Sequence, residues 1–185
     1  MPISFPQPPQ HVAEARGLTE GMPPPMPAQP VFTVGLDDLV EPGGGEAQES
    51  VTAPPTWRAS GFDAAGAPEV LELPAEPGEA DAVATGDDRF GASIRETLAV
   101  AEQDPRAREH DYEARLFRVP ALSLLALWLH ADSSVDLFVP VGRAAPGLEP
   151  NRVYADDEFM AAVRTAGEQL RTTYDEADSP EELGS

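Results

Sequence analysis

Proline is distributed unevenly along this chain, and the distribution limits where a packed core can form. Of the 21 prolines in the 185 residues, fifteen lie at or before Pro77. Proline has no backbone amide to donate, so it interrupts helices and central strands. Glycine-rich and acidic stretches alternate with these prolines. Residues 1–87 are therefore predicted to be a long, disordered, acidic and proline-rich N-terminal segment.

The charge divides at nearly the same place. Residues 1–88 hold 15 acidic residues against two arginines, and residues 89–185 hold 18 against ten, which gives the net charge of −21. Binding to nucleic acid or to an anionic membrane depends on Lys and Arg, so neither partner is expected. The balance favours a protein partner with a basic surface, or an acidic chain whose charge only maintains solubility.

Three short apolar islands interrupt the acidic half, at residues 31–40, 57–62 and 70–73. Apolar groups among acids are typical of linear motifs that become ordered when they dock in a groove. The first island is the candidate docking segment, and its apolar residues are Val31, Phe32, Val34, Leu36, Leu39 and Val40. The alternative interpretation is a strand or short arm that packs on the chain's own C-terminal domain.

The second half has the periodic patterns of a folded domain, predicted over residues 88–175. An apolar stripe at helical spacing from Phe90 to Ala101 predicts a helix over residues 88–103, capped by the acidic pair at 87–88. A second stripe, from Phe159 to Tyr174, predicts a helix that starts at Asp156. Residues 106–111 are expected to be a loop, and residues 176–185 a flexible acidic tail.

Three strands are predicted between these helices. Residues 112–119 alternate apolar and charged side chains with a period of two. Residues 121–131 are apolar on every side and suit a buried helix or a central strand, but the polar turn and β-branched run that follow favour a strand. The order predicts a small two-layer α+β domain, in which two amphipathic helices cover one face of an antiparallel sheet and Trp128 lies in the core.

Most catalytic constellations lack a residue type that they need. The chain has no Lys and no Cys, which excludes a P-loop lysine, a Schiff base, a thiolate and a disulfide. Its three histidines, His11, His110 and His130, have no zinc-site spacing. No catalytic residue, metal or cofactor is predicted. One hypothesis places His130 and Asp132 on one strand face near Arg115, and the alternative is a strand-end His and a turn-forming Asp.

A cytoplasmic location is expected, because the N-terminus lacks the features of a secretory signal. The longest apolar run, Val119–Leu129, is also too short to span a bilayer. The main functional hypothesis is a non-enzymatic interaction or accessory protein that docks on a partner with a basic or apolar groove. The alternatives are a small ligand-binding or enzymatic domain with a site near His130 and Asp132, and an acidic mimic of nucleic acid.

Overall fold

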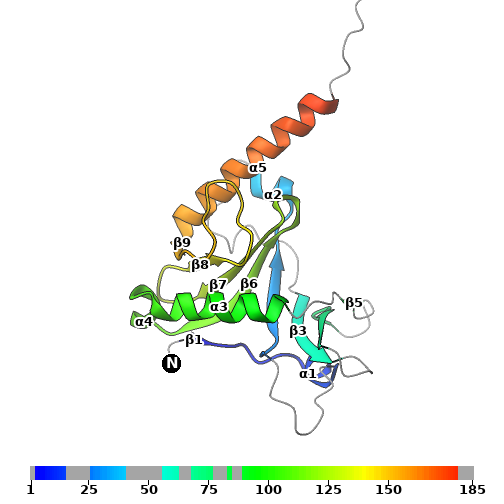
Figure 1. Cartoon of the computed structure of the whole chain (residues 1–185), viewed down its shortest axis with the longest axis vertical. Helices are drawn as coiled ribbons and strands as arrows, with labels where there is room; N and C mark the ends of the chain where they lie inside the picture. Colours follow the sequence, from blue (N-terminus) through cyan, green and yellow to red (C-terminus); the bar gives the residue numbers. More distant parts are fainter. Residues whose placement is uncertain are drawn as a thin grey trace, which may run out of the picture.

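The structure is a computed structural model that describes residues 3–15, 26–40, 56–62, 68–76, 83–84 and 89–178 (Figure 1). The strands of these residues are β1 (Ile3–Ser4), β2 (Gln29–Thr33), β3 (Thr56–Phe62), β4 (Pro68–Leu73), β5 (Val83–Ala84), β6 (Tyr112–Val119), β7 (Leu124–His130), β8 (Leu137–Pro140) and β9 (Tyr154–Ala155). The helices are α1 (Gln10–Ala15), α2 (Leu36–Val40), α3 (Arg89–Gln103), α4 (Arg106–Glu109) and α5 (Asp156–Asp178), with a 3-10 turn at Pro120–Leu122.

All nine strands of the described residues belong to one mixed sheet. Eight of them have the order β5-β4-β3-β2-β6-β7-β8-β9, and β1 pairs with β6 outside this order. The strand β6 is central: β7 lies antiparallel along one edge, while β1 and β2 lie parallel along the other. The expected small domain of three antiparallel strands after a disordered segment is therefore wrong. Five of the strands precede residue 88 and extend the sheet, and α1 and α2 also lie in this half. The acidic pair at 87–88 lies outside the described residues.

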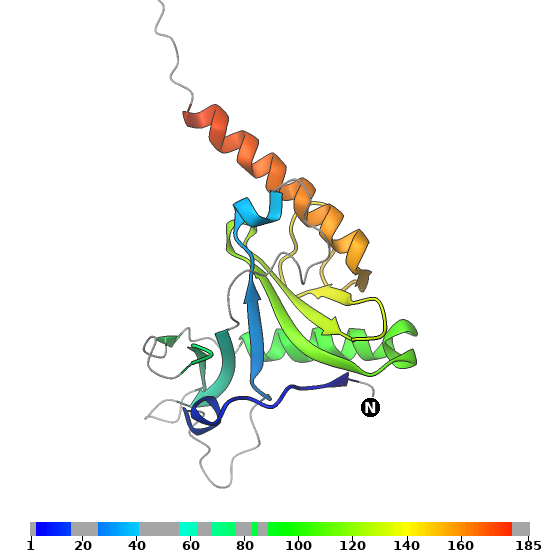
Figure 2. The same ribbon diagram turned by 180° about the vertical axis from the view of Figure 1, so that it is seen from behind.

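The two long helices lie on opposite faces of this sheet, not on one face as the sequence predicted. Figures 1 and 2, from opposite sides, show α3 in front of the sheet and then behind it. On β7, Leu127 and Leu129 pack in the cluster that contains Ile94 of α3. Ala126 and Trp128 pack in the other cluster, with Phe159 and Val163 of α5. A strand that is apolar on both sides needs a cover on both sides, so the fold has three layers.

Most of the elements expected after residue 88 are confirmed, with two corrections. The expected helix over 88–103 is α3, the three expected strands are β6, β7 and β8, and the helix from Asp156 is α5. The stretch expected to be a loop contains α4, where Asp104 Oδ1 accepts the backbone amide of Arg106 at 2.9 Å. The side chain of Tyr174 does not close a buried stripe, because it is 57% exposed.

A salt bridge ties the acidic half to the centre of the sheet. Arg118 of β6 donates two hydrogen bonds to the carboxylate of Glu72 in β4, at 2.8 and 2.9 Å, and a third to Thr33 Oγ1 at 3.1 Å. Burial alone would raise the pKa of Glu72, but hydrogen bonds from Arg118 and Thr56 and the nearby arginine charges outweigh it and lower that pKa. The folded chain thus stabilises ionised Glu72.

No helix among the described residues is both long and apolar enough to cross a membrane.

Substitution of Trp128 tests how much its side chain contributes to the stability of this core. It is fully buried, stacks on Phe138 with ring centroids 5.7 Å apart, and donates a hydrogen bond from Nε1 to Asp136 at 2.7 Å. We expect Trp128→Ala to lower the free energy of unfolding by about 3–5 kcal/mol, measured by urea denaturation. Trp128→Phe should cost less because it keeps the stacking. Equal losses in the two variants would show that the indole volume does not support the core.

The Glu72 salt bridge predicts a pH dependence of stability. Because the pKa of Glu72 is lower in the folded chain than its ordinary value of 4.5, ionised Glu72 stabilises the fold above that pH. This stability is lost as the pH falls through the folded value. Glu72→Gln should therefore lower the free energy of unfolding by about 1 kcal/mol at pH 7. Below about pH 4.5, the free energy of unfolding should decrease less steeply with falling pH in this variant than in the unmodified chain. Glu109→Gln, an exposed control, should leave the profile of the unmodified chain unchanged.

Candidate functional site

A pocket lies where the turn between β7 and β8 meets the start of α5. Its volume is about 950 Å³, and it is lined by His130, the turn residues 131–136, and residues 155–157. Four of the lining side chains are carboxylates, those of Asp132, Asp136, Asp156 and Asp157. The pocket is therefore acidic, with one imidazole at its edge.

Asp136 organises this pocket. Its carboxylate accepts hydrogen bonds from Trp128 Nε1 at 2.7 Å and from the backbone amide of Ala131 at 3.1 Å, and it lies 3.1 Å from His130 Nδ1. Its carbonyl oxygen accepts the amide of Asp156 at 3.1 Å, which fixes the first residue of α5 against the turn. One residue thus holds the indole, the imidazole, the turn and the helix start in place.

His130 lies between two carboxylates. Nδ1 faces Asp136, and Nε2 is 3.4 Å from Asp132 Oδ1. The His130 side chain is 12% exposed, whereas that of Asp132 is entirely in solvent. The sequence hypothesis paired His130 with Asp132, which the structure does place together, but it missed Asp136, the closer partner. Trp128 could have indicated this contact from the sequence, because a buried indole N–H usually needs a hydrogen-bond acceptor nearby.

Two polar side chains near the imidazole are in contact with other groups. Arg115 does not line the pocket: its guanidinium lies 5.4 Å from the ring centre of Phe32 and 5.2 Å from that of Trp128. The hydroxyl of Ser134 faces that of Tyr112 at 3.3 Å. Within the described ranges, no group of three or more His, Asp or Glu side chains is arranged to hold a metal ion.

A second candidate site lies where α2 packs on α5. The two helices meet at Gly167, where an added Cβ would lie 3.0 Å from Leu39, 3.2 Å from Val40 and 3.3 Å from Leu36. Glycine therefore lets α2 approach the backbone of α5 closely. Leu36 and Val40 remain half-buried at this contact.

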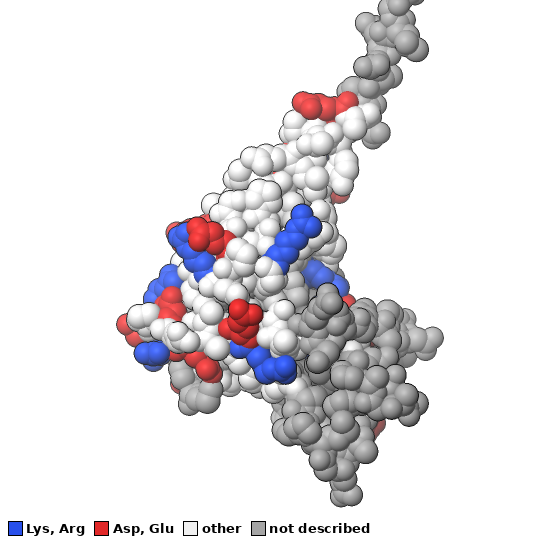
Figure 3. Space-filling model, viewed as in Figure 1, with Lys and Arg blue, Asp and Glu red and all other residues white. Residues whose placement is uncertain are grey.

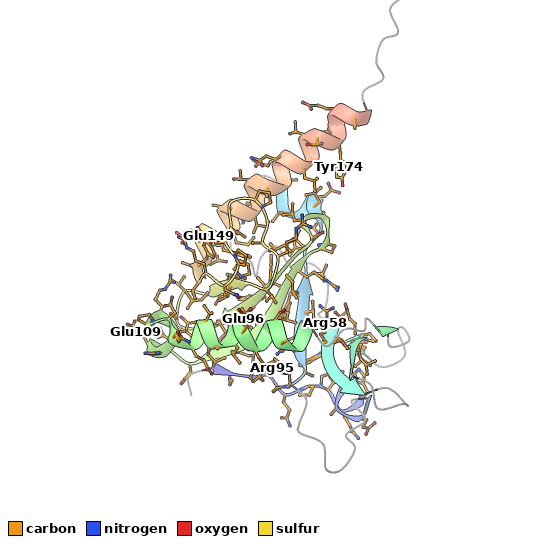
Figure 4. The ribbon with its side chains drawn as sticks, viewed as in Figure 1. Arg58, Arg95, Glu96, Glu109, Glu149 and Tyr174 are labelled. Carbon is orange, nitrogen blue, oxygen red and sulfur yellow. The ribbon has the colours of Figure 1, made fainter. Side chains whose placement is uncertain are left out.

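Beyond Gly167, α5 leaves the body of the protein. The helix has 23 residues, and Figures 1 and 2 show its C-terminal half projecting past α2. Leu170 is half-buried, and the side chains of residues 171–177 are all exposed. Tyr174 falls two turns after Gly167, on the same side of the helix, and Figure 4 labels it on the projecting end. Tyr174 is thus an aromatic side chain in solvent, on the side of α5 that packs on α2 two turns earlier.

The predicted docking segment forms part of this region. It contributes β2 and α2, which matches the alternative interpretation of an arm packed on the chain's own domain. Its six apolar residues divide into a buried set, Val31, Val34 and Leu39, and a half-buried set, Phe32, Leu36 and Val40. Phe32 is covered by Arg115, so Leu36 and Val40 are the two that border the projecting helix.

The chain matches no family model, no curated protein and no solved structure.

The close contact at Gly167 predicts a position-specific effect on stability. Gly167→Leu should displace α2 and lower the free energy of unfolding by about 1–3 kcal/mol, the usual cost of overpacking. Thr165→Leu, which places the same leucine side chain at an exposed position of the same helix, is the control and should have little effect. Equal urea midpoints for the two variants would contradict the packing of α2 on α5.

Proposed function

We propose that this chain is a non-enzymatic accessory protein that binds a protein partner through the α2–α5 surface. We define this surface by its apolar residues, Leu36, Val40, Leu170 and Tyr174, and its acidic border, Asp37, Asp175 and Glu176. The observation that carries the proposal is the exposed end of α5, where Tyr174 is 57% exposed, one turn beyond the half-buried Leu170. Short helices without packing are marginal in water, so a partner that covers this end would stabilise it.

The charge of the α2–α5 surface indicates the chemistry of the partner. Asp37, Asp175 and Glu176 are exposed, and the last turn of α5 holds no basic residue. Figure 3 shows acidic atoms at the described tip of α5. Carboxylates at a helix C-terminus add to the negative end of the helix dipole, so basic side chains of a partner are favourable there. A partner groove with an apolar slot would bury the exposed Tyr174, and basic residues at the rim of the groove would neutralise this charge.

The same features favour protein over the other proposed roles. Exposed Tyr174 lies among the carboxylates, which favours a partner with an apolar slot over the basic cleft that a mimic of nucleic acid would occupy. The alternative of a ligand-binding or enzymatic domain is supported by the oriented imidazole of His130 in its pocket. It is weakened because Arg115, one of the three side chains expected to line that pocket, lies elsewhere. A cytoplasmic location belongs to the proposal and suits a chain that has no cysteine to form disulfides.

A synthetic amphipathic helix of leucine and lysine provides a defined test of the α2–α5 surface. Added to the full-length chain, it should shift the backbone resonances of Leu36, Val40, Leu170 and Tyr174, and its binding should weaken with salt. Tyr174→Ala should lower the affinity about 10-fold, in the range of an interface anchor.

Two comparisons make this test specific. A leucine and glutamate helix of the same pattern should not bind, and Thr165→Ala, outside the surface, should bind like the unmodified chain. Shifts centred on another face, or an unchanged affinity for Tyr174→Ala, would refute the proposal.

A further inference from the structure

Two arginines meet at one carboxylate where the acidic half of the chain joins β6. Arg118 of β6 donates a hydrogen bond to each oxygen of Glu72 in β4, and the positive charge of Arg58 in β3 acts on the same carboxylate. One carboxylate neutralises one guanidinium. These three side chains therefore retain one positive charge, in a chain whose net charge is −21.

The two guanidinium groups are close enough for their charges to interact. Burial has the largest effect on Arg58 and lowers its pKa; the charge of Glu72 raises that pKa, the charge of Arg118 lowers it again, and the net direction is down. The carboxylate of Glu72 is therefore shared between two cations that repel each other. An anion seated beside both arginines would favour their charged forms.

Arg118 keeps donors that these contacts do not use. Its Nε donates to Thr33 Oγ1, and Nη1 and Nη2 each donate one hydrogen bond to Glu72. Each terminal nitrogen of a guanidinium carries two hydrogens, so each has a second N–H that makes no hydrogen bond to a described residue. The side chain of Arg118 is 28% exposed. A ligand can therefore reach this guanidinium from solvent.

Gln29 supplies a further donor in the same place. It lies opposite Arg58 across β2 and β3, and Arg58 lies opposite Glu72 across β3 and β4, so the three side chains form one row on one face of the sheet. Gln29 is 1% exposed, and among the described residues its Nε2 has no hydrogen-bond partner. Buried amides are usually hydrogen-bonded, so this donor needs an explanation. Rotation about its last side-chain torsion would turn it toward an oxygen seated on Arg58.

We propose that Gln29, Arg58 and Arg118, here named the arginine cluster, bind the phosphate group of a small molecule next to Glu72. The donors come from three strands, β2, β3 and β6, which suits a tetrahedral oxyanion better than a flat carboxylate with two oxygens. The forked N–H groups of arginine match phosphate oxygens in bidentate contacts. The phosphate would bridge the two arginines, accept a hydrogen bond from Gln29 and compete with Glu72. This site is separate from the α2–α5 surface, so each can be tested without the other.

Inorganic phosphate is the probe for this site. It is added to the full-length chain at neutral pH and at constant ionic strength, maintained with sodium chloride, which screens the distant carboxylates. Proton–nitrogen correlation spectra should show saturable shifts of the Nε–H signals of Arg58 and Arg118 and of the side-chain amide of Gln29. Acetate, which has two oxygens and a single charge, should bind several-fold more weakly.

Two substitutions should change the affinity for phosphate in opposite directions. Glu72→Gln removes the carboxylate that competes for the arginines, so phosphate should bind about fivefold more tightly, the effect of one charge at contact distance in water. Glu109→Gln changes the net charge equally, and Figure 4 labels this residue well away from Arg58, so it should leave the affinity unchanged.

The opposite change is Gln29→Glu, which places a carboxylate beside Arg58 and should weaken phosphate binding about fivefold. Gln169→Glu, at an exposed position of α5, is its matched control and should not. A gain of affinity in Glu72→Gln cannot come from a folding defect, so it separates binding from stability. Phosphate shifts that do not saturate, or that centre on another face, would overturn the proposal. So would equal affinities for phosphate and acetate, or for Glu72→Gln and Glu109→Gln.

Discussion

The burial of β7 on both faces is the constraint on which the rest of this structure depends. Leu127 and Leu129 face one helix, and Ala126 and Trp128 face the other, so neither α3 nor α5 can be removed without exposing the strand. The same constraint explains why strands from the N-terminal half of the chain extend the sheet that β6 to β9 form. With both faces covered, the free edge of β6 gains most by pairing with β2 from the acidic half of the chain.

This arrangement also fixes where each candidate site lies. The first turns of α5 must pack on Trp128 and Phe138, which brings Asp156 to the β7–β8 turn and closes the pocket around His130. Further along the same helix, α2 is brought to Gly167 because it follows β2 directly. Beyond that contact the sheet has ended, and α5 continues alone with Tyr174 exposed. One helix thus links an acidic pocket to the α2–α5 surface.

Local patterns in the sequence were sufficient to find the two long helices and three strands after residue 88, but neither the strands before it nor their assembly into one sheet. The first apolar island falls in β2 and α2, the second in β3 and the third in β4. Residues 121–131 contain β7. What could not be read was the pairing of Val31 with Leu116, because no periodicity encodes a contact across so many residues. Pro30 and Pro68 lie at or near the first residue of β2 and β4, where proline is tolerated. Because proline is also typical of disordered segments, the sequence did not reveal these two strands. Asp136 was missed because it reaches His130 across a turn.

The central claim is that the acidic half and the C-terminal half form one folded body, and native-state hydrogen exchange tests it most directly. The amide of Val34, which donates to the carbonyl of Arg118 at 2.9 Å, joins the two halves. The account predicts that this amide exchanges with the same free energy of opening as the amides of β7, because both open only on global unfolding. Exchange of Val34 at the rate of an unstructured chain, with β7 still protected, would contradict it.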